Sequence, residues 1–343
     1  MGKSTPSAVI FGCSGVALTA AEKRFFAEAR PLGLILFARN CREPGQVRNL
    51  IAAFRKTVGR ADAPVLIDQE GGRVQRLNPP HWRAAPAAAT FAALAKRNQT
   101  LAVEAVRLNA RLIAAELGDL GITVNCAPVL DVVQPDAHKV IGDRAFGGDA
   151  ATVATLAQAA CDGFLAHGIL PVIKHIPGHG RARADSHQTL PRVAADEKTL
   201  AAVDFAPFRA LRGMPWAMTA HVVYEALDRD RPATTSAPVI AKAVRGAIGF
   251  DGVLLSDDIG MKALAGPLGE RAAAALAAGC DVVLHCSGEL AEMRAVAAGA
   301  GPIGTDGLAR LRRGEAMRRT LGAWDGNAAK ARLDEIMAAG AMA

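Results

Sequence analysis

The chain has 343 residues, of which 51% are hydrophobic and 4% aromatic, and its formal net charge is +7. A chain of this length can bury a large core, so it needs neither disulfides nor a structural metal to fold. Its basic residues are dispersed and its aromatic residues are few, which argues against a nucleic-acid-binding surface. No apolar stretch is long enough to cross a bilayer without charged residues, which argues against a membrane protein.

Export and disulfide formation are not expected either. Residues 1–6 contain no long apolar segment of the kind that directs secretion. The six cysteines form no C-x-x-C pair, and Cys13, Cys126 and Cys286 lie within apolar, strand-like runs. These features predict free thiols in a reducing compartment, and hence a cytoplasmic protein. We also expect the protein to be a monomer.

Short runs rich in Val, Ile and Leu alternate with longer Ala-rich amphipathic segments along the chain. In chain order, the short runs predict eight strands that are buried on both faces, as in a parallel sheet: Ala8–Gly12, Gly33–Phe37, Pro64–Asp68, Thr123–Ala127, Pro171–His175, Trp216–Thr219, Gly252–Ser256 and Asp281–His285. The longer segments predict seven helices between them: Ala20–Ala29, Pro44–Val58, Leu101–Leu117, Ala151–His167, Glu197–Leu211, Ala237–Ile248 and Leu264–Ala278.

Eight strands with helical crossovers predict an α/β fold, a (β/α)8 barrel of the TIM type in a single domain. A doubly wound open sheet is the alternative. No G-x-G-x-x-G motif follows a strand, which argues against the dinucleotide-binding form of that sheet. Residues 304–343 are predicted to form a helical tail that packs on the outside of the barrel.

Polar side chains gather where the predicted strands end, which is where TIM barrels carry their active sites. An Asp after a strand is often a helix N-cap, and Asp258 allows that interpretation. Recurrence at five strand ends favours a functional site instead. The polar segments that follow strands three to seven are residues 68–76, 131 with 142–144, 174–175, 219–221 and 256–258.

The densest polar segment is Lys174–His187, a Gly-rich loop with three histidines and an aspartate. Histidine and aspartate are good metal ligands, so a metal site has to be considered. The spacing fits neither H-E-x-x-H nor a Cys-His finger, and Gly and Pro prevent helical presentation of the ligands. We therefore expect no metal and no cofactor.

This loop resembles the K-H-[FI]-P-G-H-G-x4-D-S-H signature of bacterial β-N-acetylhexosaminidases of glycoside hydrolase family 3. The resemblance covers roughly residues 5–300 in the order of the family's motifs. The other matching segments are Asp68–Arg76 (D-Q-E-G-G-R-V-Q-R), Ala127–Val132 (A-P-V-x-D-V), Met218–His221, Pro232–Ser236 and Ser256–Met261 (S-D-D-x-x-M).

The resemblance implies a retaining glycosidase with an unusual acid/base. Asp257 is expected to be the nucleophile that forms a covalent glycosyl-enzyme. His187, paired with Asp185, is expected to be the general acid/base, in place of the usual second carboxyl group. Histidine titrates near neutral pH and can donate a proton and then take one back. Gly178 and Gly180 are expected to let the loop move.

The resemblance also implies the sugar-binding residues Asp68, Arg76, Arg144, Lys174 and His175. Each of them could instead belong to a salt bridge that braces the barrel mouth. Four further residues of the matching motifs are expected to support the site through hydrogen bonds: Glu70, Asp131, His179 and His221.

The expected activity is removal of terminal non-reducing β-linked N-acetylglucosamine. Family members of this compact type act on anhydro-muropeptides during peptidoglycan recycling, which belongs to cell-wall biogenesis and cell division. An anionic muropeptide would suit a basic protein. Three alternatives remain open: a related glycosidase such as a β-glucosidase, a phosphorolytic variant and a non-catalytic sugar-binding protein.

Overall fold

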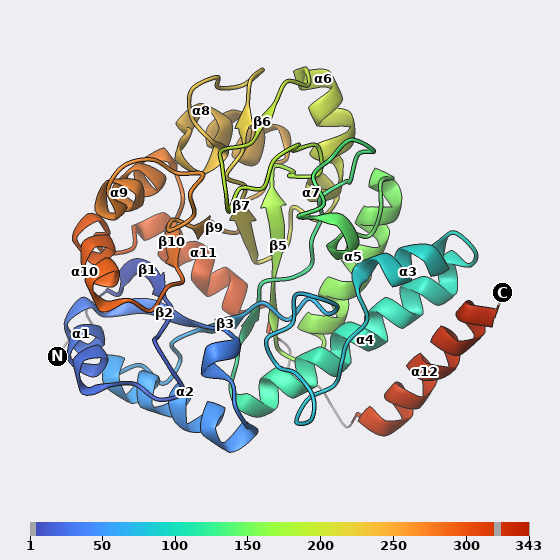
Figure 1. The fold of residues 1–343 in the computed structure, drawn as a ribbon, viewed down its shortest axis with the longest axis horizontal. Helices are drawn as coiled ribbons and strands as arrows, with labels where there is room; N and C mark the ends of the chain where they lie inside the picture. Colours follow the sequence, from blue (N-terminus) through green and yellow to red (C-terminus); the bar gives the residue numbers. More distant parts are fainter. Residues whose placement is uncertain (1–4, 319–323, 343) are drawn as a thin grey trace.

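The structure is a computed structural model that describes residues 5–318 and 324–342. Within these residues, eight parallel strands close into a barrel in the order β1-β10-β9-β7-β5-β4-β3-β2 (Figure 1). Their bounds are β1 (Ser7–Phe11), β2 (Pro31–Leu36), β3 (Val65–Ile67), β4 (Val124–Asn125), β5 (Leu170–Ile176), β7 (Trp216–Thr219), β9 (Val253–Asp258) and β10 (Val282–His285).

Closure of the sheet follows from the pairing of β1 with both β2 and β10. The (β/α)8 barrel and its eight predicted strands are therefore confirmed, and the open doubly wound sheet is wrong. Successive side chains of each strand alternate between two clusters. In β1, Ile10 belongs to the cluster inside the barrel, whereas Val9 and Phe11 belong to the cluster beneath the helices. Burial on both faces explains why the strands are continuous apolar runs.

The helices surround the barrel. Thr19 caps α1. Its hydroxyl oxygen accepts the backbone N–H of Glu22, and the Glu22 carboxylate accepts the backbone N–H of Thr19, so both N–H groups at the helix start have partners. Four predicted helices correspond to single helices in the structure, and the last predicted helix starts later, after Pro267. The bounds are α1 (Ala20–Ala29), α2 (Pro44–Val58), α4 (Gln99–Leu120), α5 (Ala150–Leu165) and α9 (Leu268–Ala278).

Two predicted helices are wrong as continuous α-helices. Glu197–Leu211 is divided into α6 (Glu197–Thr199), the π-helical η3 (Leu200–Asp204) and α7 (Ala206–Ala210). Ala237–Ile248 is divided into α8 (Ala237–Val239) and the π-helical η5 (Ile240–Ala247). Pro207 stands in the first turn of α7, where its missing N–H costs no hydrogen bond. The widened π turns keep the apolar spacing of a helix, so the sequence pattern does not reveal them.

Several short elements were not predicted. Helix α3 is apolar on all sides and shows no amphipathic period. The pair β6 and β8 forms a separate two-stranded sheet above the barrel mouth. The unpredicted elements are α3 (Ala88–Ala95), α10 (Leu290–Gly299), β6 (Arg192–Val193), β8 (Val223–Tyr224) and the 3-10 turns η1 (Ala38–Asn40), η2 (Gly142–Arg144) and η4 (Ala233–Thr235).

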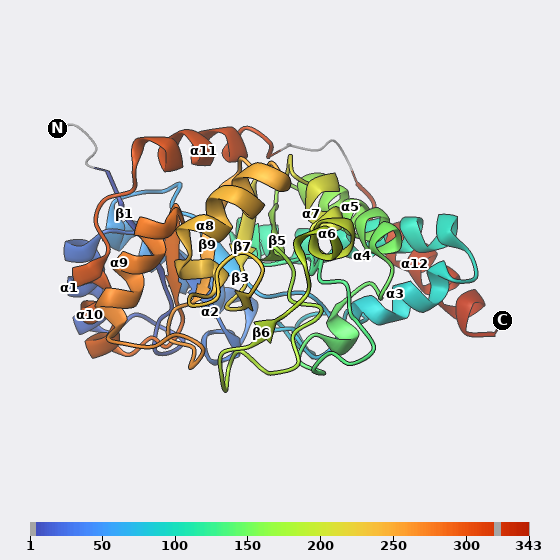
Figure 2. The same ribbon diagram turned by 90° about the horizontal axis from the view of Figure 1, so that it is seen from above.

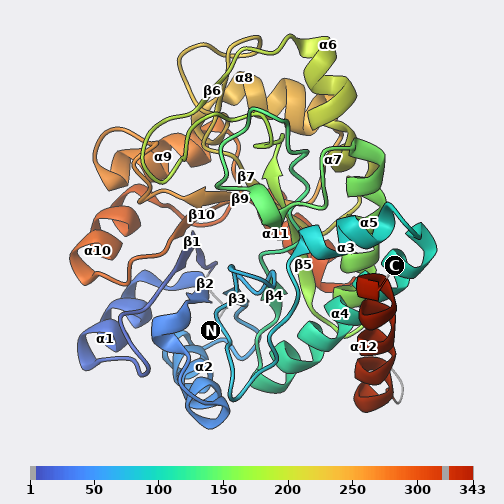
Figure 3. The ribbon, with the colours of Figure 1, turned by 45° about the vertical axis from the view of Figure 1, so that its right-hand side comes forward.

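The C-terminal segment forms two helices with different positions. Helix α11 (Thr305–Glu315) crosses the end of the barrel at which the strands begin, on the opposite side of the molecule from β6 (Figure 2). Its Leu308 and Leu311 pack against the cluster inside the barrel. Helix α12 (Gly326–Met342) lies alongside α4 (Figure 3). Residues 319–323 and 343 of the predicted tail lie outside the described residues, as do residues 1–4 of the N-terminal segment.

The end of the barrel opposite α11 remains open, and the loops that follow the strands surround it. No helix within the described residues combines the length and the apolar character needed to cross a membrane.

Candidate active site

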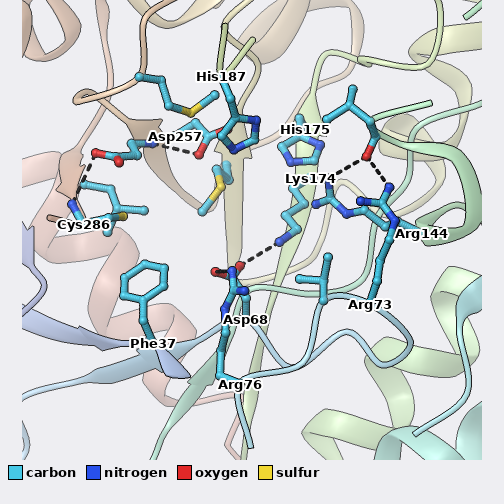
Figure 4. A pocket seen from close by; sticks show the side chains of 16 residues that line it. Phe37, Asp68, Arg73, Arg76, Arg144, Lys174, His175, His187, Asp257 and Cys286 are labelled. Carbon is cyan, nitrogen blue, oxygen red and sulfur yellow. Dashed lines mark hydrogen bonds and ion pairs between the residues drawn. The ribbon is translucent and has the colours of Figure 1, made fainter. Parts of the chain in front are cut away.

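A cavity of about 400 Å³ opens at the end of the barrel where the strands finish (Figure 4). It contains seven of the eight residues predicted as catalytic or sugar-binding, and the eighth, Asp185, is hydrogen-bonded to His187 on its wall. The cavity is lined by Phe37, Asp68, Arg73, Val74, Arg76, Val140, Arg144, Lys174, His175, His187, Met218, Asp257, Asp258, Met261, Leu284 and Cys286.

A network of buried ions forms one side of the cavity. Lys174 is 2% exposed, and its Nζ lies 2.9 Å from Oδ1 of Asp68 and 2.7 Å from Oε1 of Glu70. Arg144 donates to both carboxylate oxygens of Glu70, at 2.9 and 2.8 Å. Arg76 donates to Oδ2 of Asp68 at 3.1 Å. The sugar-binding and salt-bridge interpretations of these side chains are therefore compatible, since the ion pairs hold the donors at the cavity wall.

The charges of this network depend on one another. Burial raises the pKa of Asp68 and Glu70, but the nearby cations outweigh it. Lys174 and Arg144 lower the pKa of Glu70 to about 2, and Lys174 and Arg76 hold the pKa of Asp68 well below its ordinary value. Both carboxylates are therefore ionised at neutral pH. A buried ion pair of this kind stabilises only while both partners are charged.

Stability should consequently fall in acid. Because the pKa of Glu70 is lowered from 4.5 to about 2, the unfolded state binds more protons in this range. The contribution of Glu70 is present above about pH 4.5 and is lost as the pH falls toward 2. Between about pH 6 and pH 3, we expect the wild-type protein to lose on the order of 2 kcal/mol more unfolding free energy than Glu70→Gln. Urea unfolding at both pH values measures this difference, and an equal loss in the two proteins would contradict it.

His175 is oriented by Asp131, which is fully buried. Nδ1 of His175 lies 2.7 Å from Oδ2 of Asp131, and Oδ1 accepts the backbone N–H groups of His175 and His179 at 3.2 and 2.7 Å. Burial raises the pKa of Asp131, but its hydrogen bonds and the imidazole of His175 lower it to about 2. The ionised Asp131 therefore accepts the Nδ1 proton of His175, which turns Nε2 toward the cavity side of the ring for a ligand.

The pair His187–Asp185 has the geometry of an acid/base dyad. Oδ1 of Asp185 lies 2.9 Å from Nδ1 of His187 and accepts the backbone N–H of His187 at the same distance. The imidazole is 62% exposed, whereas Asp185 is only 17% exposed. An ionised Asp185 places the proton on Nδ1, so Nε2 is the nitrogen that can exchange a proton with a ligand.

The loop between β5 and this dyad is attached to the loop that follows β4. Gly180 O accepts the N–H of Gln134, and Ala182 O accepts the N–H of His138. A Cβ on Gly180 would stand 2.1 Å from the carbonyl oxygen of Val132, so only glycine allows this approach. Close packing thus accounts for Gly180 without loop motion. Within the described residues, no three His, Cys, Asp or Glu side chains are grouped closely enough to hold a metal ion.

Asp257 stands near the end of β9 and faces the cavity. Its Oδ1 accepts the N–H of Asp258 at 2.8 Å. The carbonyl of Asp258 accepts from Nε2 of His221 at 3.0 Å, and Nδ1 of His221 bonds to Thr234 at 2.7 Å. Burial raises the pKa of Asp257, while the imidazoles of His221 and His175 and the Asp258 N–H lower it below its ordinary value. Asp257 is therefore an anion held in one orientation.

Asp258 does not cap a helix, because the next helix, α9, begins only at Leu268. Its Oδ1 accepts the N–H groups of Gly260 at 2.9 Å and Cys286 at 3.3 Å. The carboxylate therefore links the end of β9 to the residue that follows β10.

The sequence did not single out several residues of the cavity wall, among them Phe37, Arg73 and Cys286. Phe37 ends the second predicted strand and Cys286 follows the eighth, so their position was the available signal, but neither is charged. Arg73 lies within a matching motif; its guanidinium donates to Asp143 at 2.6 Å and to three successive carbonyls of residues 139–141. Arg73 thereby holds the loop that carries Val140 and Arg144.

Comparison with known proteins agrees with the fold and identifies the family. Residues 14–302 match the family described as "Glycosyl hydrolase family 3 N terminal domain". A β-hexosaminidase of Alkalilimnicola ehrlichii is 40% identical over 283 residues, which cover 81% of this chain and 80% of that protein. A β-hexosaminidase of Pseudomonas aeruginosa is 39% identical over 287 residues, which cover 83% of each chain.

Solved structures of similar proteins point to the same family. NagZ from Neisseria gonorrhoeae, in complex with N-trifluoroacetyl-D-glucosamine, matches with a TM-score of 0.87 and 31% identity over 97% of this chain and 98% of that one. A family 3 β-N-acetylglucosaminidase from a Paenibacillus strain matches with a TM-score of 0.83 and 31% identity over 96% of this chain and 66% of that one. The chain therefore belongs to glycosyl hydrolase family 3, and it is a glycoside hydrolase of the β-hexosaminidase type.

Proposed function

We propose that this enzyme is a retaining exo-β-N-acetylglucosaminidase in which Asp257 is the nucleophile and His187, with Asp185, is the acid/base. The observation that carries the proposal is that an ionised, oriented carboxylate and an Asp-bound imidazole line one cavity of about 400 Å³. A cavity of this volume suits one sugar with part of its aglycone, and the two groups are the pair that retention requires.

The proposed first step forms the glycosyl-enzyme. An oxygen of Asp257 bonds to the anomeric carbon as the bond from that carbon to the aglycone oxygen breaks. His187 in its protonated form gives its Nε2 proton to the departing oxygen. In the second step the neutral His187 takes a proton from water, and the water oxygen displaces Asp257. The anomeric configuration is inverted twice and hence retained.

The proposed sugar contacts come from the ion network and its neighbours. Lys174, Arg76 and Arg144 are donors for hydroxyl oxygens or for the acetamido carbonyl, and Asp68 accepts from hydroxyls. His175 contributes its free Nε2. The matched Neisseria structure is a complex with N-trifluoroacetyl-D-glucosamine, which supports an N-acylated sugar as the ligand.

We further propose that the natural substrate is a GlcNAc-bearing anhydro-muropeptide and that the enzyme acts as a cytoplasmic monomer in peptidoglycan recycling. A net charge of +7 favours an anionic aglycone.

Matched substrates test this proposal. We expect kcat/KM for an aryl β-N-acetylglucosaminide to exceed that for the aryl β-glucoside by about 100-fold or more, because the buried donors would lose the acetamido carbonyl. A GlcNAc-anhydro-muropeptide should be cleaved with release of free N-acetylglucosamine. Faster turnover of the glucoside would contradict the sugar assignment, and a sugar phosphate formed only in the presence of phosphate would contradict hydrolysis.

A further inference from the structure

A buried histidine that the proposed mechanism does not use lies directly behind the nucleophile strand. His285, the last residue of β10, is 1% exposed. Its Nδ1 faces Oδ1 of Asp258 at 3.6 Å, and its Nε2 lies 3.0 Å from Oγ of Ser287 and 3.3 Å from Oε2 of Glu292 on α10. The nearest ring from β1 is that of Phe11, in an edge-to-face contact.

The neighbouring side chains orient the ring of His285. A carboxylate accepts hydrogen bonds and donates none, so the nitrogen that faces Asp258 needs a proton. The other nitrogen faces Glu292, which only accepts, and the hydroxyl of Ser287, which accepts the N–H of Glu289 and can donate its own proton. With Nδ1 directed at Asp258, the ring presents Nε2 to Ser287 and Glu292. His285 thus connects a carboxylate on the cavity wall to one that is 47% exposed on the outer helix.

Asp258 transmits this arrangement to Asp257. The N–H of the peptide that joins them donates to the Asp257 carboxylate, and the carbonyl of the following peptide, that of Asp258, accepts from His221. The Asp258 side chain is held in turn by the backbone N–H groups of Gly260 and Cys286, which donate to its Oδ1. Without His285, the Asp258 carboxylate would keep only these two N–H donors beside the Asp257 anion, and two neighbouring carboxylates repel.

We propose that His285 is a positioning residue for the nucleophile and that Glu292 holds His285 in its working orientation. The inference rests on the proposed role of Asp257. His285 touches no substrate; it acts by holding the carboxylate of Asp258 and, through the shared peptide, the carboxylate of Asp257. At metal sites, loss of a residue that hydrogen-bonds to a ligand of the metal lowers activity by roughly 10- to 100-fold. We expect an effect of similar size for a residue that holds a neighbour of the nucleophile.

The test uses Glu292→Gln, because Glu292 is half exposed and its loss should leave the fold intact. We expect kcat for formation of the glycosyl-enzyme to fall about tenfold, with KM little changed. The readout is a single turnover of a dinitrophenyl N-acetylglucosaminide, whose leaving group needs no acid. Glu289→Gln is the matched control. Glu289 is an exposed neighbour on the same segment whose carboxylate does not pair with His285, so this variant should behave as wild type.

A double-mutant cycle separates positioning from general packing. If Glu292 acts through His285, the double variant His285→Gln with Glu292→Gln should be no slower than His285→Gln alone. Wild-type turnover in Glu292→Gln, or two losses that multiply, would overturn the proposal. Should His285→Gln fail to fold, the comparison of Glu292→Gln with Glu289→Gln still decides. A fluorinated sugar that labels a residue other than Asp257 would overturn the proposed mechanism, whatever the result for Glu292.

Discussion

Asp257→Ala is expected to lower kcat on aryl β-N-acetylglucosaminides by roughly 10⁴-fold or more, because no other group could form the covalent intermediate. The thermal midpoint should fall somewhat while the fold is kept, since the lowered pKa of Asp257 means that its surroundings stabilise the ionised carboxylate in the folded protein. Asp257→Asn, which has nearly the same shape, should be equally inactive. Steady-state assays with circular dichroism would establish both points.

Azide makes this experiment specific. In Asp257→Ala, the space left by the carboxylate can admit azide, which should restore turnover of substrates with good leaving groups and give the glycosyl azide of inverted configuration. In the wild-type enzyme, a fluorinated N-acetylglucosamine that forms a long-lived intermediate should label Asp257. Asp251→Asn is a suitable control, because Asp251 lies at the other end of the barrel beside α11. Label on a different residue would contradict the assignment.

His187→Ala is expected to impair poor leaving groups far more than good ones. Protonation of the departing oxygen contributes about 10²- to 10⁴-fold when the aglycone is a poor leaving group. A sugar aglycone should therefore lose about 10³-fold in kcat/KM, and a dinitrophenyl aglycone about tenfold or less. Plotting log kcat/KM against the pKa of the leaving group measures the effect, and the slope should become steeper in the variant.

Two further variants complete this prediction. Asp185→Asn keeps the side-chain shape but no longer fixes the proton on Nδ1 of His187, so its loss should depend on the leaving group in the same direction. His81→Ala removes an exposed imidazole outside the cavity and should leave the slope unchanged. An equal loss for all aglycones in His187→Ala would contradict an acid role and favour a role in sugar binding.

The fold could be predicted because its pattern is simple. Each strand is buried on both faces, so it appears as a short apolar run, and all eight runs became strands of the barrel. The α-helices were predicted where the apolar spacing is regular. The π-helical segments Leu200–Asp204 and Ile240–Ala247 were not, because one extra residue in a turn changes the backbone hydrogen bonds but hardly the spacing. Helix α3, apolar on all sides, gave no period to detect.

The candidate site was predicted to a similar extent and for a similar reason. Ends of parallel strands meet at one end of a barrel, so polar residues that follow different strands, such as Asp68, Lys174 and Asp257, line one cavity. Apolar wall residues such as Phe37 gave no comparable signal. The sequence also showed no sign that Gly180 packs against the carbonyl of Val132, because that residue lies on another loop.

The amino-acid sequence by itself determined the barrel, the family resemblance and the residue types that chemistry at its mouth requires. Those properties depend on local patterns and on short motifs. Only the tertiary structure decided how Lys174 joins Asp68 and Glu70, and that His285 stands between Asp258 and Glu292. Burial and charge at these contacts arise from strands and helices that are distant in sequence. The protonation and orientation of the reacting groups are therefore properties of the folded chain.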